Sequence, residues 1–306
     1  MSVEPQPLAS DGGRVPRSAD PVAKVRALAR PVGELRERLL AEATDGGADV
    51  TAVKMIASAF DFAVTAHGDQ LRASGEPYVT HPAEAALILA DLGLDATTLA
   101  AALLHDVPED TNITTEELAE RFGDEVANLV DGVTKLSKFS ALSAEEQHAE
   151  NIRKMFLAMS QDIRVVLIKL GDRLHNMRTL AALGIEKQRR IARQTLEIYA
   201  PLAERLGIWQ MKWELEDLSF KALEPERYHE LARLVDMRRD ARADYVTRAI
   251  DVLRPELEKA GIKAEYSGRA KHLYSIHKKM TRKNTDFSEI YDVFAVRIID
   301  EDLREC

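Results

Sequence analysis

The residues most informative about chemistry are four side chains of types that bind divalent metal ions: His81, the adjacent pair His105 and Asp106, and Asp172. Two imidazoles and two carboxylates make a mixed nitrogen and oxygen ligand set, which suits Mn²⁺, Fe²⁺ or Zn²⁺. Such an ion acidifies bound water and offsets negative charge on phosphorus, the two requirements of phosphate-ester hydrolysis. These residues therefore point to a metal-dependent phosphohydrolase.

Each of these residues also has a simpler explanation, and their spacing alone does not decide between the two. An adjacent His-Asp pair is common, and His105 would be stabilised at the C-terminus of the apolar helix TTLAAALLHDV. His81 could belong to a loop or to the start of a helix. Asp172 could pair with Arg173 or Arg178 on a solvated face.

Helices must position these residues, because apolar side chains recur at helical spacing from about residue 50 to residue 207. Turn signals such as Gly93 and Gly184 separate the helical segments. We predict one all-α domain over residues 50–207. Before it, residues 1–49 are predicted to hold a proline-rich disordered leader and a short helix that begins near Pro31.

The C-terminal part of the chain has a different pattern. Residues 208–236 are predicted to form a helical connector broken near Pro225, and a long helix follows from about Met237 to Lys259. Two β-branched and aromatic runs, at 262–266 and 292–299, are predicted strands. Because this pattern mixes helix and strand, residues 237–306 are predicted to begin an α/β domain.

Three segments occur in a specific order: RASGEPYVTHP (72–82), LLHDVPEDT (103–111) and KLGDRLHNMRTL (169–180). Together they resemble the hydrolase half of the RelA/SpoT family, whose members make and degrade the alarmone (p)ppGpp. The resemblance continues through ARQTLEIYAPLAERLGIW, GRAKHLYSIHKKM and YDVFAVRI, and covers about residues 50–306. It implies a mainly α fold, in which an HD-type all-α metal phosphohydrolase domain precedes the incomplete start of an α/β nucleotidyltransferase-like synthetase domain.

The resemblance implies a role for particular residues of the hydrolase. The family's Mn²⁺ ligands match His81, His105, Asp106 and Asp172. Its catalytic acidic pair matches Glu109 and Asp110. Its substrate-binding residues match Arg72 against the guanine base, Asn176 beside the 3′-pyrophosphate, and Thr179 in the same pocket. Two positions depart from the family pattern, because Ala73 replaces a common lysine and Pro108 a common aliphatic residue.

The spacing of the acidic pair agrees with a catalytic role. Glu109 and Asp110 follow the His-Asp pair by three and four residues, about one helical turn. From there they can reach an attacking water without binding the metal. The alternative is that they cap the next helix, because Asp110 and Thr111 precede the helical segment TTEELAERF. Both acidic residues are retained, so we expect a competent hydrolase.

A basic segment near the C-terminus matches the family's synthetase motif. Residues 269–283 hold six lysines and arginines and no acid. The family's synthetase transfers pyrophosphate from ATP to the 3′-hydroxyl of GDP or GTP. The resemblance implies that the triphosphate of ATP is held by Arg269, Lys271, Ser275 and Lys279. It also implies that Asp292 binds Mg²⁺. The alternative is a solvated basic helix face.

The sequence ends at Cys306, before the family's guanine-stacking tyrosine and its second metal-binding glutamate. We therefore expect this chain to degrade (p)ppGpp without making it, and a full-length parent to do both. The open alternatives are an HD phosphohydrolase of another nucleotide such as a dNTP, a non-catalytic alarmone-binding module, and a parent that is chiefly a GTP pyrophosphokinase with a regulatory HD half.

Composition excludes several classes of protein. The 306 residues are 45% hydrophobic and 30% charged, which is ordinary for a globular protein. A single cysteine rules out internal disulfides and thiolate zinc clusters, and no apolar run reaches the ~18 residues of a membrane span. The net charge of −9 disfavours direct nucleic-acid binding. We expect a cytoplasmic protein whose partners are (p)ppGpp, GDP and GTP, with ribosome contact only through C-terminal domains outside this sequence.

Overall fold

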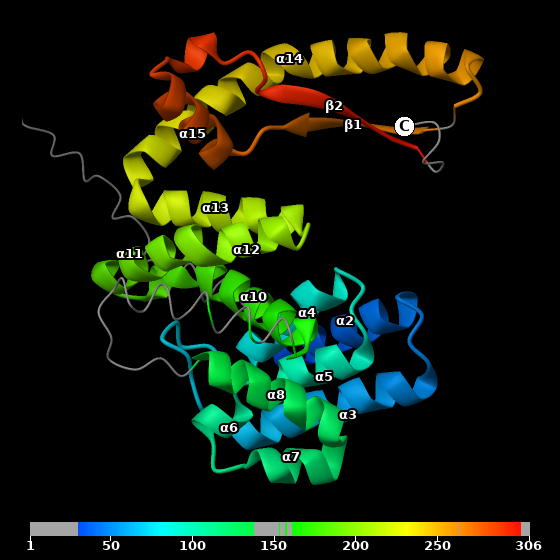
Figure 1. Ribbon diagram of the computed structural model, residues 1–306, viewed down its shortest axis with the longest axis vertical. Coiled ribbons are helices and arrows are strands. Elements are labelled where there is room, and N and C mark those ends of the chain that lie inside the picture. Colours follow the sequence, from blue (N-terminus) through cyan, green and yellow to red (C-terminus); the bar gives the residue numbers. More distant parts are fainter. Residues whose placement is uncertain (1–29, 138–152, 154–156, 158–160, 263, 301–306) are drawn as a thin grey trace, which may run out of the picture.

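The computed structural model describes residues 30–137, 153, 157, 161–262 and 264–300, so the predicted disorder of the leader lies outside the described residues. Helices make up most of the chain, and a two-stranded sheet lies near its C-terminal end (Figure 1). This arrangement confirms the predicted mainly α fold. None of the described helices is both long and apolar enough to cross a membrane.

The described elements of the first core are all helical, in line with the helical spacing of the apolar residues. Its elements are α2 (Val32–Asp45), α3 (Val50–His67), α4 (Thr80–Ala90), α5 (Ala96–Leu104), α6 (Val107–Asp110), α7 (Thr115–Phe122), α8 (Asp124–Ser137), α10 (Ile163–Arg178), the 3₁₀ turn η1 (Leu180–Ala182), α11 (Ile185–Gln194), the π-helical turn η2 (Thr195–Tyr199) and α12 (Ala200–Arg205). Helix α2 contributes Leu35 and Leu39 to this core, which therefore begins before residue 50.

Helices α4 and α5 form the centre of the first core, because most of their residues are buried and they are apolar on nearly all sides. Helix α10 packs closely on α4. A Cβ at Gly171 would lie 3.2 Å from the Leu89 side chain and 3.3 Å from the Ala85 carbonyl oxygen. A glycine at this position therefore allows the two helices to approach, and with them the residues that they carry.

The chain bends between α5 and α6. Helix α5 ends at Leu104, His105 is its C-cap, and Asp106 is the N-cap of the single-turn helix α6. Pro108 lies in the first turn of α6, where its missing N–H is tolerated. The next helix, α7, is capped instead by Thr114, which exchanges hydrogen bonds with Glu117. The alternative that Glu109 and Asp110 cap this helix is therefore wrong.

The C-terminal part contains α13 (Trp209–Leu223), α14 (Pro225–Lys259), β1 (Ala264–Ala270), α15 (Leu273–Lys283), the 3₁₀ turn η3 (Phe287–Glu289) and β2 (Phe294–Asp300). The predicted break at Pro225 is confirmed, but the predicted helix start at Met237 is wrong. Helix α14 is continuous because no glycine or proline interrupts it between Pro225 and Pro255. The strands are antiparallel, with Gly268 opposite Val296, and α14 runs along them (Figure 1).

Helix α13 belongs to two cores. Its residues Met211 and Leu215 are buried in the first core, whereas Phe220 is buried with Ile276 and Val293 in the second. The two cores therefore meet within α13.

Candidate metal centre and active site

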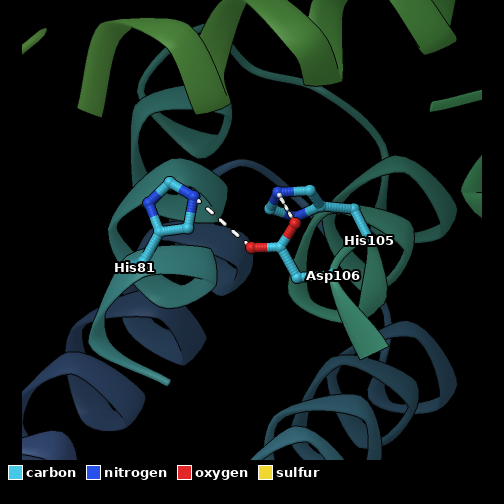
Figure 2. A group of neighbouring side chains, drawn as sticks. All are labelled: His81, His105 and Asp106. Carbon is cyan, nitrogen blue, oxygen red and sulfur yellow. Dashed lines mark ion pairs between the residues drawn. The ribbon is translucent and has the colours of Figure 1, made fainter. Parts of the chain in front are cut away.

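Two histidines and an aspartate meet at the ends of three helices (Figure 2). His81 is the second residue of α4, and His105 and Asp106 lie at the bend between α5 and α6. The Asp106 carboxylate lies between the two rings, with Oδ2 3.6 Å from His81 Nε2 and Oδ1 3.1 Å from His105 Nε2. One ligand atom of each residue lies within 4.8 Å of the others. Three of the four predicted metal ligands are thus brought together.

The fourth predicted ligand, Asp172, reaches the same place from α10. Its side chain is buried, and Oδ1 lies 3.1 Å from His81 Nε2. Its other oxygen lies 2.6 Å from Lys169 Nζ, and the Asn176 amide donates a hydrogen bond to Oδ1. The alternative that Asp172 lies on a solvated face is therefore wrong.

The two arginines that were candidate partners of Asp172 bind elsewhere. Arg173 donates a hydrogen bond to the Tyr199 hydroxyl, 2.9 Å away, and its guanidinium lies over that ring. Arg178 pairs with Glu214 on α13 at 2.6 Å.

The protonation of His105 leaves an atom suited to a cation. His105 Nδ1 lies 2.7 Å from the Ala102 carbonyl oxygen, so Nδ1 carries the proton and Nε2 has the lone pair. That Nε2 is buried and has no hydrogen-bond partner among the described residues. A buried acceptor without a donor is unfavourable. His105 Nε2 faces a carboxylate oxygen of Asp106 and no hydrogen-bond donor of the described residues. This pair of lone-pair-bearing atoms therefore fits a divalent metal ion as ligands.

His175 contacts Nδ1 of His81, as the Ala102 carbonyl oxygen contacts Nδ1 of His105. His81 Nδ1 lies 2.7 Å from His175 Nδ1, so Nε2 of His81 is turned toward the aspartates. Burial lowers the pKa of His81, although Asp172 opposes this effect. Burial also disfavours the charge on Asp172, but Lys169 and His81 outweigh it and lower the pKa of that carboxyl well below its usual value. Neutral imidazoles and ionised carboxylates are the states that bind metal ions.

The acidic pair lies one turn beyond the His-Asp pair, as its spacing predicted. Glu109 and Asp110 end α6 and line a cavity of about 670 Å³ that opens between α6 and the C-terminal part of α3. Partial burial, together with the nearby Asp106, raises the pKa of Glu109. The Tyr78 hydroxyl donates to Asp110 Oδ2 at 2.6 Å. Sequence reasoning did not assign Tyr78 a role, although it lies in the segment 72–82.

The predicted substrate residues share a second cavity with the metal centre. This cavity, also about 670 Å³, is lined by Arg72, Asn176 and Thr179 and by the candidate ligand Asp172. Its volume is typical of small-molecule sites. The Arg72 guanidinium donates to Asn176 Oδ1 at 3.0 Å, which links it to Asp172 through the Asn176 amide.

Cations that sequence reasoning missed line the same cavity: Lys169 and Arg173 on α10, and Lys187, Arg190 and Arg193 on α11. The three on α11 recur every third residue, which places them along one side of the helix. That spacing in the segment EKQRRIARQ could have revealed them. The cavity therefore has the Asp172 carboxylate, which contacts His81 of the cluster, in one wall and a row of positive charges along α11.

The predicted synthetase residues lie apart from this centre, on β1, α15 and the segment before β2. Arg269 belongs to β1 and Ser275 to α15. The Asp292 carboxylate is held by two ammonium groups, Lys271 Nζ at 2.8 Å and Lys279 Nζ at 2.6 Å. Their hydrogen bonds lower the pKa of Asp292 far below its usual value. The predicted Mg²⁺ ligand is thus paired with two predicted phosphate-binding lysines.

Comparison with known proteins matches both parts of the chain. Residues 59–209 match the HD domain, and residues 268–306 match the region found in RelA/SpoT proteins. A probable guanosine-3′,5′-bis(diphosphate) 3′-pyrophosphohydrolase of Synechocystis is 55% identical over 82% of this chain and 33% of its own length. A GTP pyrophosphokinase of Myxococcus xanthus is 54% identical over 80% and 33%, respectively.

A third relative has both activities in its name. The bifunctional (p)ppGpp synthase/hydrolase of Escherichia coli is 50% identical over 83% of this chain and 36% of its own length. The chain spans about a third of the length of these three relatives.

Proposed function

Because the chain belongs to the RelA/SpoT family, we propose that it hydrolyses the 3′-pyrophosphate of (p)ppGpp and releases GDP or GTP and pyrophosphate. One observation supports this proposal above the others. The buried residue Asp172 belongs both to the His-Asp cluster and to the wall of the cation-lined cavity. A phosphorylated ligand bound in that cavity would therefore lie beside the candidate metal ligands.

The proposed cofactor is Mn²⁺, held by His81, His105, Asp106 and Asp172. When bound, it would supply Lewis-acid chemistry, by polarising the phosphoryl group and acidifying water. His105 Nε2 is buried and has no hydrogen-bond partner in the part of the chain that the structure describes, which supports a cation here.

The chain's own residues would bind the substrate and handle protons. Arg72 would pack on the guanine base with Thr179 nearby, and Asn176 would bind the 3′-diphosphate. Glu109 would accept the proton of the attacking water together with Asp110, while the bond between the 3′-oxygen and phosphorus breaks. The released 3′-oxygen would take up a proton as the hydroxyl of the product.

The cations on α11 suit the other end of the same molecule. A nucleotide whose 3′-diphosphate lies beside Asp172 still has a 5′-diphosphate or triphosphate to neutralise. Lys187, Arg190 and Arg193 line the cavity and form no ion pair with another described residue. Such exposed cations attract phosphate most strongly at low ionic strength. This arrangement favours a substrate with two phosphorylated ends over one with a single triphosphate, such as a dNTP.

A second function is proposed for the C-terminal part, because it matches the RelA/SpoT region and one relative is named a GTP pyrophosphokinase. Lys271 and Lys279 would bind the triphosphate of ATP there, with Mg²⁺ at Asp292. Synthesis of (p)ppGpp and contact with ribosomes are proposals for a longer protein.

Chromatography of ppGpp incubated with the chain, with and without Mn²⁺, tests the hydrolase proposal. We expect GDP and pyrophosphate only with the metal, and little turnover of a dNTP. Asp106→Ala should abolish both turnover and Mn²⁺ binding, whereas Asp110→Ala should abolish turnover and keep Mn²⁺ binding. Asp251→Ala, on the exposed surface of α14, is the control. Normal hydrolysis by both site variants would refute the assignment.

A further inference from the structure

The hydroxyl of Tyr78 lies between two carboxylates of the candidate active site. It is 2.6 Å from Asp110 Oδ2 and 3.1 Å from Asp106 Oδ2. Tyr78 belongs to the segment between α3 and α4, whereas both aspartates belong to the bend at α6. The Tyr78 side chain thus connects a candidate metal ligand, Asp106, to a candidate catalytic carboxylate, Asp110.

A phenolic hydroxyl has one proton, and ionised carboxylates can only accept hydrogen bonds. Tyr78 can therefore satisfy only one of its two neighbours at a time, and the shorter distance favours Asp110. A cation held by Asp106 would compete with the Tyr78 hydroxyl for the lone pairs of that carboxylate. The hydrogen bond to Asp110 would then be favoured further.

Several contacts hold Tyr78 in this position. Its ring stacks on His67 with the ring centres 4.7 Å apart and the planes 25° from parallel. Its backbone N–H donates to the Gln70 carbonyl oxygen at 2.9 Å. The Gln70 side-chain amide donates to the Asp110 carbonyl oxygen, also at 2.9 Å, and its oxygen contacts His67 Nδ1. The tyrosine and the acid are therefore fixed to each other through both side chain and backbone.

We propose that Tyr78 is a positioning residue for the hydrolysis, which holds the Asp110 carboxylate in place beside Asp106. This inference rests on the proposed function. A tyrosine hydroxyl ordinarily has a pKa of about 10, so that of Tyr78 is a donor at neutral pH. Its contribution is orientation, because a catalytic base that is free to rotate is in the right place for only part of the time.

Tyr78→Phe tests this proposal, because phenylalanine keeps the ring that stacks on His67 and removes only the hydroxyl. Since hydrogen bonds to charged groups are among the stronger ones, we expect kcat for ppGpp to fall roughly 10- to 100-fold. KM should stay within about twofold and Mn²⁺ affinity within about threefold, because the hydroxyl is not a metal ligand and does not line the cation-lined cavity. The thermal midpoint should change little.

Tyr228→Phe is the matched control. Tyr228 packs in the second core and forms no side-chain hydrogen bond within the described part of the chain, so its kcat should equal that of the wild type. The inference is refuted if Tyr78→Phe keeps a wild-type kcat, or if Mn²⁺ affinity and folding stability fall as much as kcat. Absence of ppGpp hydrolysis in the wild-type protein would instead refute the proposed function on which the inference rests.

Discussion

The Nδ1 atoms of His81 and His175 lie 2.7 Å apart in the buried centre of the first core. One proton must lie between them, because two lone pairs at this distance repel each other. A His81 that binds a metal through Nε2 carries this proton on Nδ1 and donates it to His175. Burial, followed by the neighbouring His81, lowers the pKa of His175 well below its usual value, which keeps it a neutral acceptor.

His175→Phe removes the acceptor and keeps an aromatic ring. The Nδ1–H of His81 then loses its partner, and its ring loses the contact that fixes its tautomer. Residues that orient a metal ligand in this way typically contribute 10- to 100-fold to metal affinity, so we expect Mn²⁺ affinity to fall by about that factor. Isothermal titration calorimetry of the metal-free protein measures it. His229→Phe, on the exposed surface of α14, should bind Mn²⁺ normally. An unchanged affinity in a folded His175→Phe protein would contradict the prediction.

Gly171→Ala should loosen the contact between α10 and α4. The new Cβ would lie 3.2 Å from Leu89 and 3.3 Å from the Ala85 carbonyl oxygen, so the helices must separate slightly. Overpacking of this kind costs roughly 1–3 kcal/mol, and the higher helix propensity of alanine returns up to ~1 kcal/mol. We expect a net loss of stability in urea unfolding. Mn²⁺ affinity should also weaken, because the contact aligns His81 with Asp172.

Gly33→Ala is the control for this effect. Nothing lies within 4 Å of a Cβ at Gly33, which is in the first turn of α2. Alanine there should be neutral or stabilise the protein by up to ~1 kcal/mol. If Gly171→Ala stabilises the protein as much as Gly33→Ala does, the close approach of the two helices is not important.

Local patterns predicted the helices well but could not predict the site. The apolar repeats and turn signals of residues 50–207 are local, and the structure follows them. The position of His81 beside Asp172 depends on how α4 packs on α10, across 91 residues of sequence, and only the resemblance to a family indicated it.

Two of the missed residues, Tyr78 and His175, share this cause. Tyr78 and His175 act through hydrogen bonds that join residues 32 and 94 positions apart, so no spacing rule identifies them. The wrong start of the long helix has a local cause instead. A single proline at 225 was followed by 29 residues without a helix breaker, and the break assumed near 236 had no glycine or proline to support it.

Arg190→Gln should weaken substrate binding more than it slows turnover. Arg190 lines the cation-lined cavity from α11, where it would face the phosphates remote from the reacting bond. An ion pair at close range is worth about 1 kcal/mol in water, which corresponds to roughly fivefold in affinity. We expect KM for ppGpp to rise by about that factor at low salt, and kcat to stay within about twofold. The difference should shrink as salt is added.

Arg189→Gln provides the control on the neighbouring residue. Arg189 pairs with Glu186 and does not line the cavity, so its substitution removes the same charge from α11 without removing a cavity residue. Steady-state kinetics of the two variants should differ in KM. Equal values would show that only the net charge of the helix matters.

Asp292→Asn should release two cations for phosphate binding. Lys271 and Lys279 both contact the Asp292 carboxylate, so in this state their charges are largely neutralised. Without that carboxylate, inorganic tripolyphosphate in metal-free buffer should bind at least about threefold more tightly at low salt, because each exposed pair contributes up to ~1 kcal/mol. Mg²⁺-ATP should gain nothing, because the variant has lost the predicted Mg²⁺ ligand.

Asp286→Asn is the control. Asp286 lies at the N-cap of η3 and is not paired with Lys271 or Lys279, so this variant should leave both affinities unchanged. If tripolyphosphate binds equally to wild type and Asp292→Asn, these two lysines do not form a phosphate site.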